Sequence, residues 1–146
     1  MILDNDLIVS DAQAVTADAG STNLIDLGVT GRRIGAGEPM ALVLFVDVAA
    51  DGTTTDETYS INIQTDDDVA FGSATTLQAN VKTYAELVVN SQFAFVIDPN
   101  WNFERYVRGY FDVGGTTPSV TGTLGLMPLA AVRKYKEYAN AYVITH

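Results

Sequence analysis

Apolar and polar residues alternate through two consecutive segments in the last third of this chain. Between residues 105 and 113, every second position from Val107 to Val113 is apolar or glycine, and the positions between them carry tyrosine, arginine or aspartate. Residues 119–127 show the same period of two. Successive side chains leave a strand on opposite sides, so both segments are predicted to be half-buried strands. The five residues between them, 114–118, include two glycines and a proline, which predicts a β-hairpin with a five-residue loop.

Alternation and turn residues divide the rest of the chain into further short strands. We expect strands at 22–27, 40–48 and 59–65, with one weak strand between 69 and 80. Residues 86–90 and 92–98 are expected to form two further strands, or one long strand that bends at 90–91. Residues 1–20 are expected to form an N-terminal arm or an edge strand that docks on the domain. The sum is about eight short strands and hardly any helix, which is typical of an antiparallel β-sandwich, jelly roll or small barrel. At this length we expect one all-β domain over residues 1–146.

Residues 40–48 form the most apolar segment, and both of its faces are apolar. One face includes Leu44, and the other includes Val43 and Phe45. A strand that is buried on one face only should alternate between apolar and polar residues, so a second element is expected to cover the face that carries Phe45. The N-terminal arm and a second subunit are the two candidates for this cover.

The composition excludes several classes of site. The chain has no cysteine, and its one histidine is the final residue, His146, which excludes thiolate catalysis, cysteine-based metal sites and a histidine-based triad. The formal net charge is −10, with thirteen acidic and two basic residues in 1–68. An acidic surface repels phosphate backbones and so disfavours nucleic-acid binding. No apolar run approaches the roughly 20 residues of a membrane helix, and the acidic start lacks the basic region of a signal peptide. We therefore expect a protein made and kept in the cytoplasm of its producer, without a membrane partner.

Two segments carry groups that could bind an ion or a partner. Asp66, Asp67 and Asp68 either ligate a cation such as calcium or form a charged strand end that discourages edge pairing. The spaced acidic pattern of a calcium loop is absent, so no metal or cofactor is expected. Arg32 and Arg33 lie in a glycine-rich loop that lacks the Gly-Lys-Ser/Thr ending of a phosphate loop. They either dock on an acidic patch of a partner or remain solvated. No constellation of titratable groups indicates an enzyme.

The tail, residues 130–146, is the most suggestive contact element. Three of its tyrosines are three and four residues apart, so they share one face if the tail is helical, although an extended arm fits equally well. Tyrosine and arginine are enriched at protein interfaces. The tail either contacts a partner or packs on its own domain. The candidate interface residues of the whole chain are Arg32, Arg33, Phe45, Arg133, Lys134, Tyr135, Tyr138 and Tyr142.

Several short stretches resemble the small cement, or decoration, proteins of short-tailed phages of the Bordetella phage type. They are the Met-Ile-Leu-Asp start, Ser-Asp-Ala-Gln-Ala-Val-Thr at 10–16, Ile-Asp-Leu-Gly at 25–28, Ile-Gly-Ala-Gly-Glu-Pro at 34–39, and Arg-Tyr-Val-Arg at 105–108 with the Val-Gly-Gly-Thr-Thr-Pro that follows. The resemblance spans most of the chain and rests on glycine and turn signatures. It implies a jelly-roll protein of the virion that sits on the outer surface of the icosahedral head. Such a protein clamps neighbouring major capsid subunits, as a homodimer. The interface candidates above rest on composition, because the resemblance supplies no map of binding residues.

Two other classes of function remain open. A carbohydrate- or receptor-binding module of a virion is also an all-β sandwich, and it would place exposed aromatic side chains in a groove. A small hydrolase would require a pocket that contains a carboxylate of perturbed pKa. Trp101 is the only tryptophan, which disfavours a sugar-processing cleft.

Overall fold

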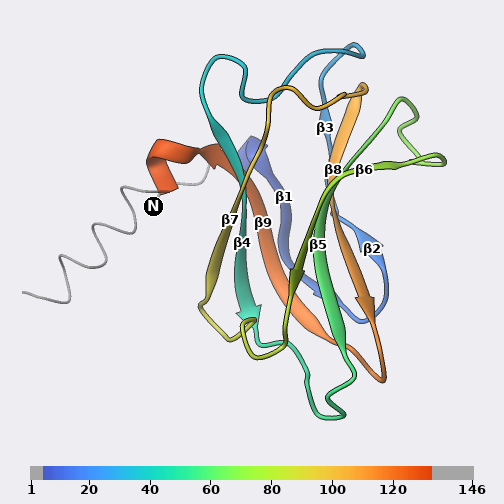
Figure 1. The fold of residues 1–146 in the computed structure, drawn as a ribbon, viewed down its shortest axis with the longest axis vertical. Helices are drawn as coiled ribbons and strands as arrows, with labels where there is room; N and C mark the ends of the chain where they lie inside the picture. Colours follow the sequence, from blue (N-terminus) through green and yellow to red (C-terminus); the bar gives the residue numbers. More distant parts are fainter. Residues whose placement is uncertain (1–4, 133–146) are drawn as a thin grey trace, which may run out of the picture.

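The computed structural model describes residues 5–132, which form two antiparallel sheets packed face to face (Figure 1). Sheet A contains, in spatial order, β1 (Ile8–Val15), β9 (Val120–Pro128), β4 (Met40–Val48) and β7 (Gln92–Val96). Sheet B contains β2 (Ala19–Gly20), β8 (Tyr106–Gly114), β5 (Thr58–Asp66) and β6 (Thr75–Lys82), and β3 (Ile25–Asp26) also pairs with β8. A short 3-10 helix, η1 (Asn5–Leu7), precedes β1.

Most connections cross from one sheet to the other, which is the jelly-roll arrangement. Only β5 and β6 follow each other in the described chain and also pair with each other. β2 pairs with β8 at Phe111 and β3 pairs with β8 at Val107, so these two short strands together occupy the place of one. The predicted all-β antiparallel jelly-roll sandwich of about eight short strands is therefore confirmed. The N-terminal segment supplies β1, an edge strand of sheet A.

The hydrophobic core lies between the sheets and is built from the inward face of each strand. β4 and β5 match the strands predicted at 40–48 and 59–65 to within one residue at each end. The largest fully buried side chains include Tyr59, Phe111, Leu44, Ile61, Ile63, Leu87 and Leu124. Complete burial of an apolar side chain of this size contributes about 1.5–3 kcal/mol, so this inner layer is the main source of stability.

The hairpin predicted over 105–127 is wrong. β8 and β9 have the expected bounds to within one residue, but β8 pairs with β5 whereas β9 pairs with β1 and β4. The connection between them therefore carries the chain across one end of the sandwich. Gly115 permits the sharp turn, since its φ is +91° and a Cβ there would lie 2.5 Å from the carbonyl oxygen of Asp56. Alternation indicates which face of a strand is buried, but it does not indicate the strand's partner.

Two weaker strand predictions also change. Residues 86–90 are not a strand, because Thr83 accepts backbone hydrogen bonds from Glu86 and Leu87 and closes a turn. Leu87 still enters the core, where it is 0 % exposed. The strand predicted at 22–27 is reduced to β3, while the weak strand expected between 69 and 80 is β6, eight residues long.

The outer face of sheet A is apolar and is partly covered by the chain itself. Ala41 and Val43 lie on the face of β4 that points away from the core, yet both are fully buried, because they pack with Met127 and Val132. Residues 129–132 are helical and follow β9 directly, at the red end of the ribbon in Figure 1. The cover found in the structure is thus the start of the C-terminal segment, whereas the sequence pointed to the N-terminal arm or a second subunit. Nowhere in residues 5–132 is a helix long and apolar enough to cross a membrane.

Candidate functional site

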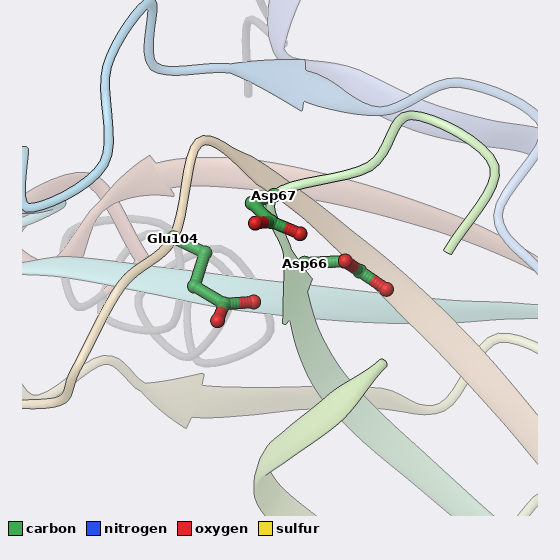
Figure 2. A group of neighbouring side chains, drawn as sticks. All are labelled: Asp66, Asp67 and Glu104. Atoms are coloured by element: carbon green, nitrogen blue, oxygen red, sulfur yellow. The ribbon is translucent and has the colours of Figure 1, made fainter. Parts of the chain in front are cut away.

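Three carboxylates gather where β5 ends and β8 begins (Figure 2). Asp66, Asp67 and Glu104 each offer one oxygen, and these oxygens all lie within 4.8 Å of one another. The antiparallel register brings them together, because Asp66 is paired with Tyr106, two residues after Glu104. The backbone N–H of Glu104 also donates to Oγ1 of Thr65 at 2.8 Å. Sequence analysis identified the two aspartates but missed Glu104, since only the pairing of β5 with β8 indicates that it is near.

Asp66 is the buried member of this group, and the loop that follows engages its carboxylate. Oδ1 accepts the backbone N–H of Asp68 at 3.0 Å, and Oδ2 accepts the backbone N–H of Ser73 at 2.9 Å. The hydrogen bond from Asp68 lowers the pKa of Asp66 below its ordinary value; burial opposes this shift, and the bond from Ser73 adds to it. Asp66 is therefore an ionised cap for residues 67–74.

The three carboxylates fit a charged and capped strand end better than a cation site. Calcium takes about six to eight oxygen ligands. Both oxygens of Asp66 already accept backbone N–H groups, so a cation would depend mainly on Asp67, which is exposed, and Glu104. Of the two interpretations of the aspartate run, the geometry favours the charged strand end over the cation site. Its expected effect on edge pairing is wrong, however, because β5 lies between β8 and β6 and is not an edge strand.

The two candidate arginines between β3 and β4 have different surroundings. Arg32 is exposed, and its Nη1 donates to the carbonyl oxygen of Leu27 at 3.1 Å. Arg33 is also exposed, and it lines an open surface cavity of about 480 Å³ together with Trp101 and Glu104. This cavity places a cation, an aromatic ring and a carboxylate around one volume. Sequence analysis noted Trp101 only as the single tryptophan, without a place in a site.

Phe45, the third candidate, lies on the outer face of sheet A. It is half-buried and packs against the apolar cluster that contains Val43 and Val132. The structure thus brings Phe45 to the base of the predicted contact tail, of which residues 130–132 are helical. The other five candidates lie outside the described residues: Arg133, Lys134, Tyr135, Tyr138 and Tyr142.

A comparison with models of protein families identifies the family of this chain. The family Bbp16 matches residues 9–126, which run from β1 into β9 and include both sheets. The chain belongs to the Bbp16 family. Bbp16 is a family of Bordetella phage proteins, so the resemblance to proteins of that phage type is confirmed. A search of curated proteins finds no match. The region matched to Bbp16 ends before the tail, so the family assignment rests on the sandwich alone.

Within the Bbp16 region, the outer face of sheet B holds an arginine that sequence analysis did not single out. Arg108 is half-buried, and its Nε and Nη2 donate to Oε1 of Gln64 at 3.0 and 2.9 Å. The guanidinium carbon lies 4.1 Å from the ring centroid of Phe71 and 5.0 Å from that of Tyr110. Burial lowers the pKa of Arg108 and raises the pKa of Tyr110. The sequence placed Arg108 on the polar face of its strand, but it gave no signal that Gln64 and Phe71 surround it.

Proposed function

We propose that this Bbp16-family protein is a capsid cement protein. In this role it has no enzymatic activity, binds the outer surface of the mature icosahedral head and clamps neighbouring major capsid subunits. Membership of a phage protein family supports a role in a phage, and the jelly-roll sandwich is compatible with a purely structural role. The observation that carries the proposal is the apolar outer face of sheet A, because this face is a second apolar surface on strands already buried on their inner side.

The proposed contact surface combines this outer face with the tail that starts beside it. Val132 covers Val43, whereas Phe45 remains half-buried and Val96 on β7 is 49 % exposed. An apolar sheet face that residues 5–132 cover only in part is a surface suited to another protein. The sequence of the tail contributes arginine, lysine and tyrosine, of which arginine and tyrosine are enriched at protein interfaces.

Such a protein would act by mass action. If it binds the expanded head more tightly than the precursor shell, binding stabilises the mature form. A homodimer would carry each contact surface twice, so that one dimer could join two neighbouring subunits. Repetition over the capsid lattice makes a modest affinity at each site sufficient.

Co-sedimentation with mature heads stripped of the protein tests this proposal, with precursor heads as the comparison. We expect saturable pelleting with mature heads and weaker pelleting with precursor heads. A truncation after Val132 removes 133–146 but keeps the packing of Val132 on Val43, and it should weaken pelleting. A folded protein that pellets with neither shell would sink the proposal. Sedimentation velocity tests the homodimer separately.

The cavity beside Trp101 favours a second candidate function, a carbohydrate- or receptor-binding module of a virion. Trp101 is half-buried there, next to Arg33, and a saccharide ring can stack on an indole while its hydroxyls bond to charged groups. A glycan array probed with the wild-type protein and Trp101→Ala distinguishes the two functions. Binding of a glycan that needs Trp101, by a protein that does not pellet with heads, would replace the cement role.

A further inference from the structure

Arg108 is surrounded by side chains from β5, from the loop that follows β5 and from its own strand. Oε1 of Gln64 occupies the Nε–Nη2 edge of the guanidinium, and the guanidinium carbon lies over the rings of Phe71 and Tyr110. Gly20 on β2 allows a close approach, because a Cβ there would lie 2.8 Å from Nη1 of Arg108. A guanidinium is planar and carries its donors in a rigid fork. Among residues 5–132, the guanidinium donates only through Nε and one N–H of Nη2, so the edge formed by Nη1 and Nη2 can take a second acceptor.

The loop after β5 is organised so that it holds the ring of Phe71 against this cation. Phe71 has a φ of +53°, which is unusual for a bulky aromatic residue, and its side chain is buried. Its backbone N–H donates to the carbonyl oxygen of Asp68 at 3.0 Å, and Asp66 caps the loop on both sides of it. Backbone strain of this kind persists only where the surrounding structure enforces it, and it concentrates at functional sites.

No carboxylate within residues 5–132 forms an ion pair with Arg108. Burial lowers the pKa of Arg108, and the nearby charge of Asp66 offsets only part of this shift, because both oxygens of Asp66 accept backbone N–H groups of the following loop. Asp18 lies near the same face, and its Oδ1 accepts a backbone N–H of β8 at 2.9 Å. Arg105, which directly precedes β8, is different, because it forms a two-point ion pair with Asp26 at 2.9 and 3.0 Å.

We propose that the Nη1–Nη2 edge of Arg108 binds a carboxylate side chain of a partner protein, with Phe71 and Tyr110 as the platform around it. A guanidinium that is partly removed from water gains most from an acceptor of opposite charge, and a carboxylate matches two parallel N–H donors. Arginine and tyrosine are also the residue types that dominate interface hot spots. The identity of the partner rests on the proposed function: the carboxylate belongs to a major capsid subunit of the mature head.

The test compares Arg108→Gln with Arg105→Gln in the co-sedimentation assay with stripped mature heads. Each substitution removes one positive charge, at a residue just before β8 or on it, but of the two arginines Arg108 alone lacks a carboxylate partner among the described residues. We expect Arg108→Gln to raise the apparent Kd at least tenfold, because truncating one member of a desolvated charge pair leaves the other without its partner. Arg105→Gln should pellet like the wild type. Added salt should weaken the wild type more than Arg108→Gln.

Two further variants keep the test decisive if Arg108→Gln does not fold. Arg108→Lys keeps the charge but loses the planar fork, and Phe71→Leu removes the aromatic platform; each should raise the apparent Kd at least threefold. Near-ultraviolet circular dichroism checks that each variant is folded.

The outcomes separate the inference from the function on which it rests. If the wild type pellets and the folded Arg108 variants pellet equally well, the inference is wrong and the cement role stands. If the wild type does not pellet, the cement role fails and the named partner fails with it. If Arg108→Gln instead dissociates a homodimer without changing the affinity for heads, the carboxylate comes from a second copy and the capsid assignment is overturned.

Discussion

The carboxylate of Asp66 accepts the backbone N–H of Ser73 at 2.9 Å, and this hydrogen bond closes the loop that holds Phe71 against Arg108. One buried acid at the end of β5 thus organises a loop and, through it, a cation on the neighbouring strand. The acidic run that looked like a candidate ion site is a structural cap whose effect extends to the outer face of sheet B.

Asp66→Asn is expected to destabilise the fold in a pH-dependent way. The backbone N–H of Asp68, helped by Ser73, holds the folded-state pKa of Asp66 below its ordinary value of 3.8. A carboxyl with a depressed folded pKa stabilises the protein above its unfolded pKa, and this contribution is lost as the pH falls through the folded pKa. The thermal midpoints of wild type and variant should therefore differ at pH 7 and converge below about 3.8.

Asp11→Asn is the matched control for this experiment, since Asp11 is an exposed aspartate on β1, outside the loop that Asp66 caps. Its thermal midpoint should stay near that of the wild type at pH 7. A difference between wild type and Asp66→Asn that stays constant from pH 7 to pH 3 would show that the charge of the cap is irrelevant.

Two truncations separate the packing role of the C-terminal segment from its proposed contact role. A chain that ends after Val132 keeps the side chain that covers Ala41 and Val43, so its free energy of unfolding should match that of the full chain. A chain that ends after Pro128 loses Leu129 and Val132 and should unfold about 2–4 kcal/mol more easily, from the loss of one or two buried aliphatic side chains. Urea unfolding measures both. Equal stability of the two truncated chains would show that the helical residues 129–132 do not cover the sheet in solution.

The strands of this fold could be predicted from the sequence because apolar residues recur at every second position, even where both faces of the strand are buried. Residues 40–48 and 59–65 each carry an inward apolar row, and both were placed to within one residue at each end. The pairing of β8 could not be predicted in the same way. Val107 and Phe111 face the core whether β8 pairs with β9 or with β5, so alternation is compatible with both topologies.

The residues that surround the candidate sites were harder to predict from the sequence than the strands. Phe45 was found because it interrupts the expected alternation of β4, a local signal. Glu104 and Phe71 gave no such signal, since their neighbours Asp66 and Arg108 are brought to them by register and by a loop of unusual backbone conformation. Contacts between segments far apart in the chain depend on the partner of each strand, which was the part of the fold that the sequence left undetermined.

Gly115→Ala should destabilise the crossing from β8 to β9. The backbone of Gly115 has a φ of +91°, and an added Cβ would lie 2.5 Å from the carbonyl oxygen of Asp56. We expect a loss of about 1–3 kcal/mol in the free energy of unfolding, because a strained φ and a backbone clash add. Gly37→Ala is the control, since no atom lies within 4 Å of a Cβ at that position. A loss of similar size in both variants would mean that the turn does not require glycine.

Tyr59→Phe tests how the loop between β4 and β5 is joined to the loop between β8 and β9. The phenol of Tyr59 donates to the carbonyl oxygen of Asp51 at 2.7 Å and accepts the backbone N–H of Ser119 at 3.2 Å. Phenylalanine keeps the ring in the core but leaves both backbone groups without this partner, so the free energy of unfolding should fall by about 1–3 kcal/mol at pH 7.

Alkaline pH provides the internal check on this hydrogen bond. Burial raises the pKa of Tyr59 above its ordinary value of 10.0, so the folded state favours the protonated phenol. The protonated phenol contributes fully to stability below the pKa that Tyr59 has in the unfolded state. This contribution is lost as the pH rises through the pKa that Tyr59 has in the folded state. The stability difference between wild type and Tyr59→Phe, measured by urea unfolding, should therefore shrink above about pH 10, while the other tyrosines affect both proteins equally. A difference that is unchanged, or that grows, above that pH would rule out the phenol proton as the link between the two loops.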